Sequence, residues 1–384
     1  MPAIYADHAA TTPLHPEVAE AMIDSMKKPA GNPSSVHEYG RGARKRLDGA
    51  RRTIASFINA SPKEIVWTSG GTESNNLALR GFMHANQDKG NHLVTSAIEH
   101  HAVLHTAQAL EKEGFQVTYV RPDEQGIVSV EKIMAAVTEE TVLVSLMYVN
   151  NETGVVQPVH EAAGRLAEKG IAFHTDMVQA YGQLLLNVKE TPVTMATITA
   201  HKINGPAGAG GLFVRQGAKI RPELTGGEQE RKRRAGTENV AAVEGFAKAA
   251  ELQMNSLEKR RQELESLRAA FLAELDRSGV FYQINGEHAE KSPHILNVYF
   301  PGIQLESFLV QMDMEGIAVS SGSACTAGTV EPSHVLEAMY GKDARIYESV
   351  RFSFGYGNTV EDMKTAAQAA VKISRKMKKK EALK

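Results

Sequence analysis

The sequence has only one cysteine, Cys325, which excludes an internal disulfide bond and any metal site built from cysteines alone. It also lacks an apolar run near the roughly 20 residues that span a bilayer. Residues 1–8 do not combine a basic start with a long apolar stretch, so we expect no signal peptide. The formal net charge is −2, too small to attract nucleic acid or an anionic membrane. These absences predict a soluble, cytoplasmic protein without a membrane or direct nucleic-acid partner.

The chain is long and apolar enough to bury a large core, with 42% hydrophobic residues among 384. Two helices are expected near the start, at 17–27 and 41–58. Strand and helix patterns then alternate. The expected strands are 64–68, 92–97, 116–120, 141–148 and 172–175, and the helices between them are 72–85, 101–113, 130–136 and 159–169. Such alternation predicts an α/β fold with a mainly parallel sheet that binds ligands at the carboxyl ends of its strands.

The pattern changes near residue 240, where two long helices, 240–255 and 257–277, are expected. A smaller α+β unit follows. Its expected strands are 294–300, 317–319 and 349–354, and its helices are 304–315 and 360–376. We therefore predict a large domain over 15–255, and a small domain formed by 1–14 with 256–384.

Lys202 stands between two short apolar segments, 195–199 and 212–215, in a stretch with little other charge. A buried lysine is costly unless it is paired, neutral or covalently used. Burial lowers the pKa of its amine and makes it a nucleophile suited to a Schiff base. The alternative is a lysine that bends out to solvent at the Gly-rich turn that follows, as most lysines are exposed.

The segment 68–74, Thr-Ser-Gly-Gly-Thr-Glu-Ser, follows a strand and opens a helix. Glycines allow close approach of a ligand to the backbone, and a helix N-terminus offers free N–H groups, so the segment is suited to bind phosphate. It is no Walker loop, because no Gly-Lys-Ser/Thr follows. The alternative is a helix that Thr72 caps after a tight turn. The glycines at 205–211 lead into a strand, which argues against nicotinamide or flavin binding.

Four polar residues lie just past expected strand ends and so are able to face one crevice: His100, Asn151, Asp176 and Gln179. A buried carboxylate beside a pyridine nitrogen keeps that ring protonated and electron-withdrawing, and an imidazole is able to stack on it. The alternative for Asp176 is a turn or cap residue.

His101 and His105 are spaced i, i+4, which allows a metal site in principle. No pattern such as His-Glu-x-x-His accompanies them, so we predict no metal. The basic runs at 231–234 and at the C-terminal end lack interleaved aromatics, and we expect them to be solvated.

Cys325 lies in the segment 320–329, whose other residues are small or polar. A lone cysteine is usually a small buried hydrophobe. This composition instead predicts a mobile loop with an exposed thiol, and a thiol is reactive in proportion to its thiolate fraction. We therefore predict a functional thiol.

Taken together, these motifs resemble those of cysteine desulfurases of the NifS/IscS type, a branch of the class-V aminotransferase family of pyridoxal phosphate enzymes. The resemblance runs nearly end to end. The segments that carry it are 5–13, 32–35, 68–76, 99–100, 149–154, 176–179, 201–202, 234–237, 320–325 and 351–353. It implies a fold-type I transferase with a mixed, mainly parallel sheet in the large domain.

The resemblance also implies roles for individual residues. Lys202 would hold pyridoxal 5′-phosphate as a Schiff base, Asp176 would pair with the pyridine nitrogen, and His100 would stack on the ring. The other cofactor contacts would be Gln179 at the ring hydroxyl, Asn151, and, toward the phosphate, Gly71, Thr72, Thr199, His201 and Thr237 from a second subunit. Asn151 and Arg351 would hold the substrate carboxylate.

The implied enzyme is a homodimer that takes sulfur from L-cysteine, releases alanine and leaves a persulfide on Cys325. A sulfur-acceptor protein would then receive the sulfur for iron–sulfur cluster assembly or tRNA thiolation. The alternatives on the same fold are an aminotransferase, a selenocysteine lyase or another β-lyase, and a further alternative is a non-catalytic pyridoxal-binding module.

Overall fold

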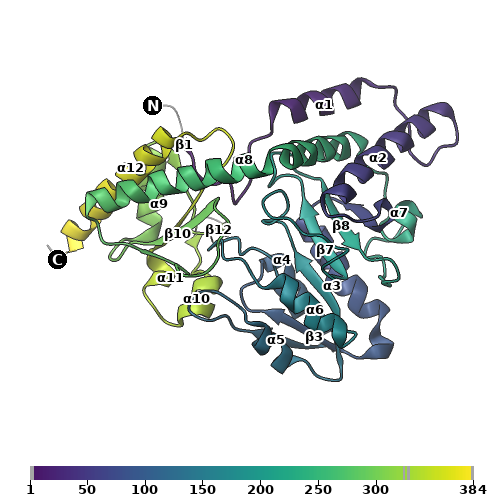
Figure 1. Ribbon diagram of the computed structural model, residues 1–384, viewed down its shortest axis with the longest axis horizontal. Coiled ribbons are helices and arrows are strands. Elements are labelled where there is room, and N and C mark those ends of the chain that lie inside the picture. The colour runs from purple at the N-terminus through teal and green to yellow at the C-terminus, as the bar shows by residue number, and fades with distance from the viewer. Residues whose placement is uncertain (1–3, 323–324, 327–328, 382–384) are drawn as a thin grey trace.

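A seven-stranded sheet organises the N-terminal part of the chain (Figure 1). The structure is a computed structural model that describes residues 4–322, 325–326 and 329–381. The strand order is β2-β8-β7-β6-β5-β3-β4. The strands are β2 (Ile65–Thr68), β3 (His92–Ser96), β4 (Gln116–Val120), β5 (Thr141–Ser145), β6 (Ala172–Asp176), β7 (Met195–Thr199) and β8 (Gly210–Val214). Only β8 runs against its neighbours, so the sheet is mixed and mainly parallel, as predicted.

Helices cover both faces of this sheet, because successive residues of its buried strands point to opposite sides. Leu93 packs in one hydrophobic cluster with α3 and α4, and its neighbour Val94 packs in the other with α2 and α6. The helices of this part are α1 (Pro16–Lys27), α2 (Glu38–Phe57), α3 (Gly71–Ala85), α4 (His101–Lys112), α5 (Val130–Ala136), α6 (Val159–Glu168) and α7 (Gln229–Lys232), with short 3₁₀ helices at Pro62–Glu64 and Gln87–Lys89.

One continuous helix, α8 (Val240–Ser278), links the two parts of the molecule (Figure 1). The prediction of two helices was wrong here. No glycine or proline interrupts residues 251–261, and the hydroxyl of Ser256 donates to the carbonyl of Leu252 at 2.7 Å, one turn back, so the helix tolerates its polar middle. The N-terminal half of α8 packs in the core of the sheet and its C-terminal half in a second core. We propose that the domain boundary falls within α8.

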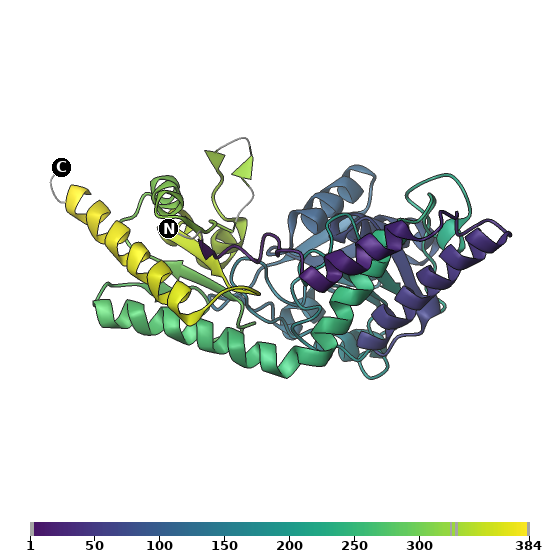
Figure 2. The ribbon, with the colours of Figure 1, turned by 90° about the horizontal axis from the view of Figure 1, so that it is seen from above.

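The second core belongs to an α+β unit at the C-terminal end (Figure 2). An antiparallel sheet in the order β14-β10-β9 is its centre. The elements are β9 (Gln283–Ile284), β10 (Ile295–Tyr299), α9 (Leu305–Met314), β11 (Ile317–Ala318), β12 (Cys325–Thr326), β13 (Thr329–Val330), α10 (His334–Tyr340), α11 (Arg345–Glu348), β14 (Ser349–Ser353) and α12 (Val360–Glu381). The sequence analysis missed β9, α10 and α11; β9 and α11 are too short to show a clear period.

The N-terminal segment joins this unit. β1 (Ile4–Tyr5) pairs in parallel with β11, and Asp7 bridges to Ser353. We propose that these first residues belong to the small domain. No helix in the described ranges combines the length and apolarity required to traverse a bilayer.

Candidate active site

A cavity of about 460 Å³ lies at the carboxyl ends of the central strands, against the C-terminal unit. Because β2, β3, β5, β6 and β7 all point the same way, the segments that follow them meet at one edge. The residues predicted from sequence that line this cavity are Gly71, Thr72, His100, Asn151, Asp176, Gln179, Thr199, His201, Lys202 and Arg351. The topology thus brings together groups that are up to 280 positions apart in the chain, from Gly71 to Arg351.

Lys202 enters the cavity from a tight turn after β7, closed by hydrogen bonds from Ile203 and Gly205 to the carbonyl of Ala200. Its amine donates to the carbonyl oxygens of Ala9 and Ala10, the latter at 2.7 Å. Burial, aided by the charge of Arg351, lowers the pKa of Lys202 to about 7. The side chain therefore does not bend out to bulk solvent, and its amine is available as a nucleophile near neutral pH.

Asp176 ends β6 and is buried at the floor of the cavity. Its carboxylate accepts hydrogen bonds from the amide of Asn75 at 2.7 Å and from the backbone N–H of Val178 at 2.9 Å. The side-chain oxygen of Asn75 is buried without a partner among the described residues. Sequence reasoning missed Asn75, because the contact between α3 and the end of β6 depends on the order of the strands in the sheet.

Gln179 lines the cavity with Asp176, and both ends of the Gln179 side-chain amide have hydrogen-bond partners. The Nε2 group donates to the carbonyl of Ala9 at 2.8 Å, and Oε1 lies 3.2 Å from Nε2 of His294. Burial lowers the pKa of His294 to about 3, so this ring is neutral and able to donate from Nε2. Gln179 therefore has a fixed orientation at the cavity wall.

The N-terminus of α3 forms the other end of the cavity. The cap position is Gly70, with no side-chain cap, so Thr72 is not the capping residue and faces the cavity instead. Gly70 has a φ of 154°, and a Cβ added at Gly210 would lie 2.5 Å from the Cα of Gly70. Only glycines allow this close approach, which leaves the first N–H groups of α3 free toward the cavity.

Two further residues complete this end. Thr199 donates from its hydroxyl to the carbonyl of Ala209 at 3.2 Å. His201 has its Nδ1 3.2 Å from the hydroxyl of Thr11, and burial together with the nearby Lys202 lowers the pKa of His201 to about 4. This end of the cavity therefore offers neutral donors and a helix terminus, an arrangement that suits an anion.

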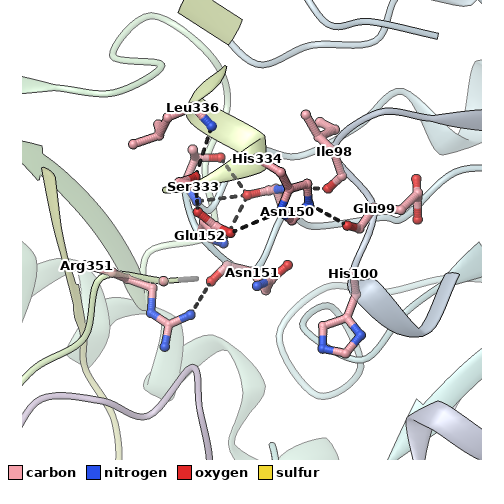
Figure 3. Close-up of polar contacts among 12 residues, drawn as sticks. Ile98, Glu99, His100, Asn150, Asn151, Glu152, Ser333, His334, Leu336 and Arg351 are labelled. Carbon is pink, nitrogen blue, oxygen red and sulfur yellow. Dashed lines mark hydrogen bonds and ion pairs between the residues drawn. The ribbon is translucent and has the colours of Figure 1, made fainter. Parts of the chain in front are cut away.

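His100 is the N-cap residue of α4. Its Nδ1 accepts a hydrogen bond from the backbone N–H of Ala102 at 3.0 Å, which fixes the ring. Burial lowers the pKa of His100, although the charge of Asp176 opposes the shift. The ring therefore presents a neutral, flat surface to the cavity (Figure 3).

Arg351, on β14, closes the cavity from the C-terminal unit. Its guanidinium donates to the carbonyl of Asn151 at 2.9 Å (Figure 3). It also donates to the carboxylate of Asp7 at 2.7 Å. The Nε–H of Arg351 is buried without a partner among the described residues. Sequence reasoning did not assign Asp7 a role, because only the fold brings residues 7 and 351 together.

Two predicted residues are not among those that line the cavity. Thr237 is exposed on the surface of its own chain. Cys325 begins β12, which pairs with β13, where a loop without strands was expected. The side chain of Cys325 lies outside the described part of the structure, as do residues 323–324 and 327–328 of the segment predicted as a mobile loop.

His101 and His105 stack on each other with ring centroids 5.0 Å apart. In the ranges that the structure describes, no three His, Cys, Asp or Glu side chains are placed to hold a metal ion. In the basic run at 231–234, Arg234 is not freely solvated, because it forms an ion pair of 2.7 Å with Glu73 at the start of α3.

Comparison with known proteins gives consistent matches over nearly the whole chain. The aminotransferase class-V family model matches residues 4–365. The Bacillus subtilis (strain 168) protein named "Putative cysteine desulfurase IscS 1" is 47% identical over 378 residues, 98% of this chain and 100% of the relative. The solved structure of a NifS-like protein superposes with a TM-score of 0.89 at 34% identity, covering 97% of this chain and 99% of that one. The structure named "SspA in complex with cysteine" superposes with a TM-score of 0.81 at 32% identity, covering 91% and 98%.

Proposed function

The chain belongs to the class-V aminotransferase family and, within it, to the cysteine desulfurases; from this we propose that it is an enzyme that removes sulfur from L-cysteine. The single observation that carries the proposal is one cavity that joins the amine of Lys202, the carboxylate of Asp176 and the guanidinium of Arg351. A related protein was solved in complex with cysteine, which supports this amino acid as substrate.

Pyridoxal 5′-phosphate is the cofactor of this family, and the cavity fits it. Burial lowers the pKa of Lys202 to about 7, which makes the uncharged amine available for attachment to an aldehyde. The buried carboxylate of Asp176 is suited to a protonated pyridine nitrogen, and the free N–H groups at the start of α3 are suited to a phosphate. When bound, the cofactor supplies an electron sink for the bonds that break at the substrate.

In this proposal the other residues of the cavity bind the cofactor and the substrate. His100 would stack on the cofactor ring, Gln179 would bond its hydroxyl group, and Asn151 would lie beside it. Gly71, Thr72, Thr199 and His201 would bind its phosphate. Arg351, with Asn151, would bind the substrate carboxylate, and the displaced amine of Lys202 would move the substrate's Cα proton.

Cys325 would be the sulfur acceptor. Its thiolate attacks the substrate's sulfur, so that an S–S bond forms as the C–S bond breaks. The electron pair of the broken bond stays on the substrate's Cβ, a proton is added there, and alanine leaves. The persulfide on Cys325 then passes to an acceptor, and iron–sulfur assembly and tRNA thiolation are the uses we propose.

We further propose that the enzyme is a cytoplasmic homodimer in which Thr237 reaches the phosphate end of the partner subunit. Thr237 is exposed and does not line its own chain's cavity, which is consistent with a contact to a second subunit.

The proposal is tested by a spectrum of the purified protein, followed by alanine and persulfide measurements after addition of L-cysteine. We expect the absorbance of lysine-bound pyridoxal phosphate and one alanine per sulfur transferred. A protein that keeps the cofactor but forms no alanine would favour a pyridoxal-binding module instead.

A further inference from the structure

Glu152 is a buried carboxylate to which the proposed chemistry assigns no role. It lies in the loop after β5, lines the cavity and is 1% exposed. Its Oε2 accepts a hydrogen bond of 2.5 Å from the hydroxyl of Ser333, which belongs to the C-terminal unit (Figure 3). From the opposite side, the amide of Asn297 on β10 donates to the backbone carbonyl of Glu152 at 3.1 Å. Glu152 thus joins the cavity wall to the C-terminal unit.

Glu152 controls how α10 begins. Ser333 is the N-cap residue of this helix, and its hydroxyl oxygen accepts from the N–H of Leu336 at 3.0 Å. A hydroxyl has a single proton, and here the proton is donated to Glu152, so the carboxylate fixes the rotation of the capping group. The next residue, His334, contacts the carbonyl of Glu99 through Nε2 at 2.9 Å, and its Nδ1 lies 3.9 Å from Glu152.

The same side chain also faces the residue that precedes the Cys325 segment. A Cβ added at Gly322 would lie 3.1 Å from Cγ of Glu152, and Gly322 has a φ of 91°. Just before it, Ser320 is paired with the backbone of Arg351. The described residues on both sides of Cys325, Gly322 and Ser333, therefore meet at one carboxylate.

We propose that Glu152 is a positioning residue for sulfur transfer: it holds Ser333, eight positions after Cys325, against the loop that presents Asn151. This inference rests on the proposed function. Because Glu152 is buried, water does not replace a lost partner of its side chain, so breaking the hydrogen bond with Ser333 leaves an unsatisfied buried group. Misplacement of a reacting group by about 1 Å can cost about a hundredfold in rate, which is why an anchor outside the chemistry matters.

The test compares three serine variants of the holoenzyme. Ser333→Ala removes the hydrogen bond to Glu152, and Ser333→Thr keeps a hydroxyl. Ser96→Ala is the control, because Ser96 donates at 2.6 Å to another buried acidic side chain, Glu99, within the N-terminal unit. Two quantities are measured: the apparent Kd of L-cysteine from the change in cofactor absorbance, and the single-turnover rate of persulfide formation on Cys325 by mass spectrometry.

We expect Ser333→Ala to keep the wild-type Kd and to form persulfide about 10- to 100-fold more slowly. Ser333→Thr should recover most of the rate, and Ser96→Ala should match the wild type. The proposal is overturned if Ser333→Ala forms persulfide at the wild-type rate, if Ser96→Ala slows the step equally, or if the slow step is matched by an equal loss of cysteine binding.

Glu152→Gln provides a second route if Ser333→Ala does not fold. Its amide oxygen still accepts from Ser333, but without the charge, so an intermediate loss of persulfide rate is expected, and a wild-type rate would contradict the proposal. A wild-type enzyme that forms alanine without any persulfide on Cys325 would instead refute the proposed function.

Discussion

Asp7 and Arg351 form an ion pair of 2.7 Å although 344 positions separate them in the chain. The pair connects the N-terminal segment to β14 at the wall of the cavity. Arg351 is 4% exposed, so its charge acts in a poorly solvated region and lowers the pKa of Lys202, while Asp7 raises it. Burial is the largest cause of the lowered pKa of Lys202, and the charges of Arg351 and Asp7 adjust it in opposite directions.

Replacing Arg351 with glutamine should raise the KM for L-cysteine about 10- to 100-fold, because hydrogen bonds to charged groups contribute about 1.5–3 kcal/mol. The cofactor absorbance should remain. Arg345→Gln is the matched control, since Arg345 lies over the ring of Tyr340 at 4.5 Å and does not line the cavity. Steady-state kinetics measure both variants, and an unchanged KM in Arg351→Gln would contradict the assigned role.

The lowered pKa of Lys202, about 7, predicts how cofactor attachment depends on pH. Only the uncharged amine attacks an aldehyde, so in cofactor-free protein the attachment rate should rise from about pH 6 to 8 and level off above. Loss of the positive charge in Arg351→Gln should move the midpoint to higher pH. Stopped-flow absorbance after mixing with pyridoxal phosphate measures the rate. A rate that still climbs toward about pH 10 would indicate an unshifted lysine.

Replacing Cys325 with serine should separate sulfur transfer from the other reactions of this fold. The variant should bind the cofactor and show the spectral change on adding L-cysteine, but alanine and sulfide release should fall by at least about a thousandfold, since the hydroxyl is a far weaker nucleophile. The assay is alanine formation with a thiol reductant present. An aminotransferase or β-lyase has no need of this thiol, and its turnover would be nearly unchanged.

Glu230 should be a major determinant of stability. Its carboxylate holds the buried guanidinium of Arg51 through two hydrogen bonds of 2.7 and 2.6 Å and accepts from the N–H of Trp67 at 2.9 Å. It begins a left-handed turn in which φ is 48°, 59° and 66° at residues 230, 231 and 232. Glu230→Gln should lower the free energy of unfolding by about 3–5 kcal/mol, because Arg51 keeps a buried, unpaired charge.

The double variant Arg51→Met, Glu230→Met should recover part of that loss, since it leaves no buried charge. Trp67 is the only tryptophan and lies 5.2 Å from the Arg51 guanidinium, so its fluorescence in urea reports unfolding at this place. Equal midpoints for wild type and Glu230→Gln would show that the pair does not stabilise the fold.

The predicted elements of the N-terminal unit agree closely with the structure. The expected strand 116–120 and helix 130–136 coincide with β4 and α5, and the apolar segment 195–199 coincides with β7. These segments have a clear hydrophobic period and are bounded by turn residues, so local chemistry decides them. In contrast, α8 is continuous through a polar middle, because its two halves are each held by a separate core, which no local pattern reveals.

The residues that line the cavity were predictable to the extent that they follow strand ends. Asp176 and His100 were found in this way, whereas Lys202 was found as a lysine in an apolar stretch. Asn75 and Asp7 were missed, since each matters through a partner more than 100 positions away: Asp176 for Asn75 and Arg351 for Asp7. The position of a residue at the end of a strand can be predicted from nearby sequence, whereas the distant residue that it contacts cannot.

The sequence by itself determined the order of strands and helices. It also identified Cys325 as the single thiol and Lys202 as a lysine in an apolar stretch, because these features depend only on neighbouring residues. The tertiary structure alone decided that the amine of Lys202 is buried beside Arg351, and that Glu152 meets Ser333 from the other unit. The burial of a group and its pairing with charges depend on all the residues around it. Those residues come together only when distant parts of the chain have packed.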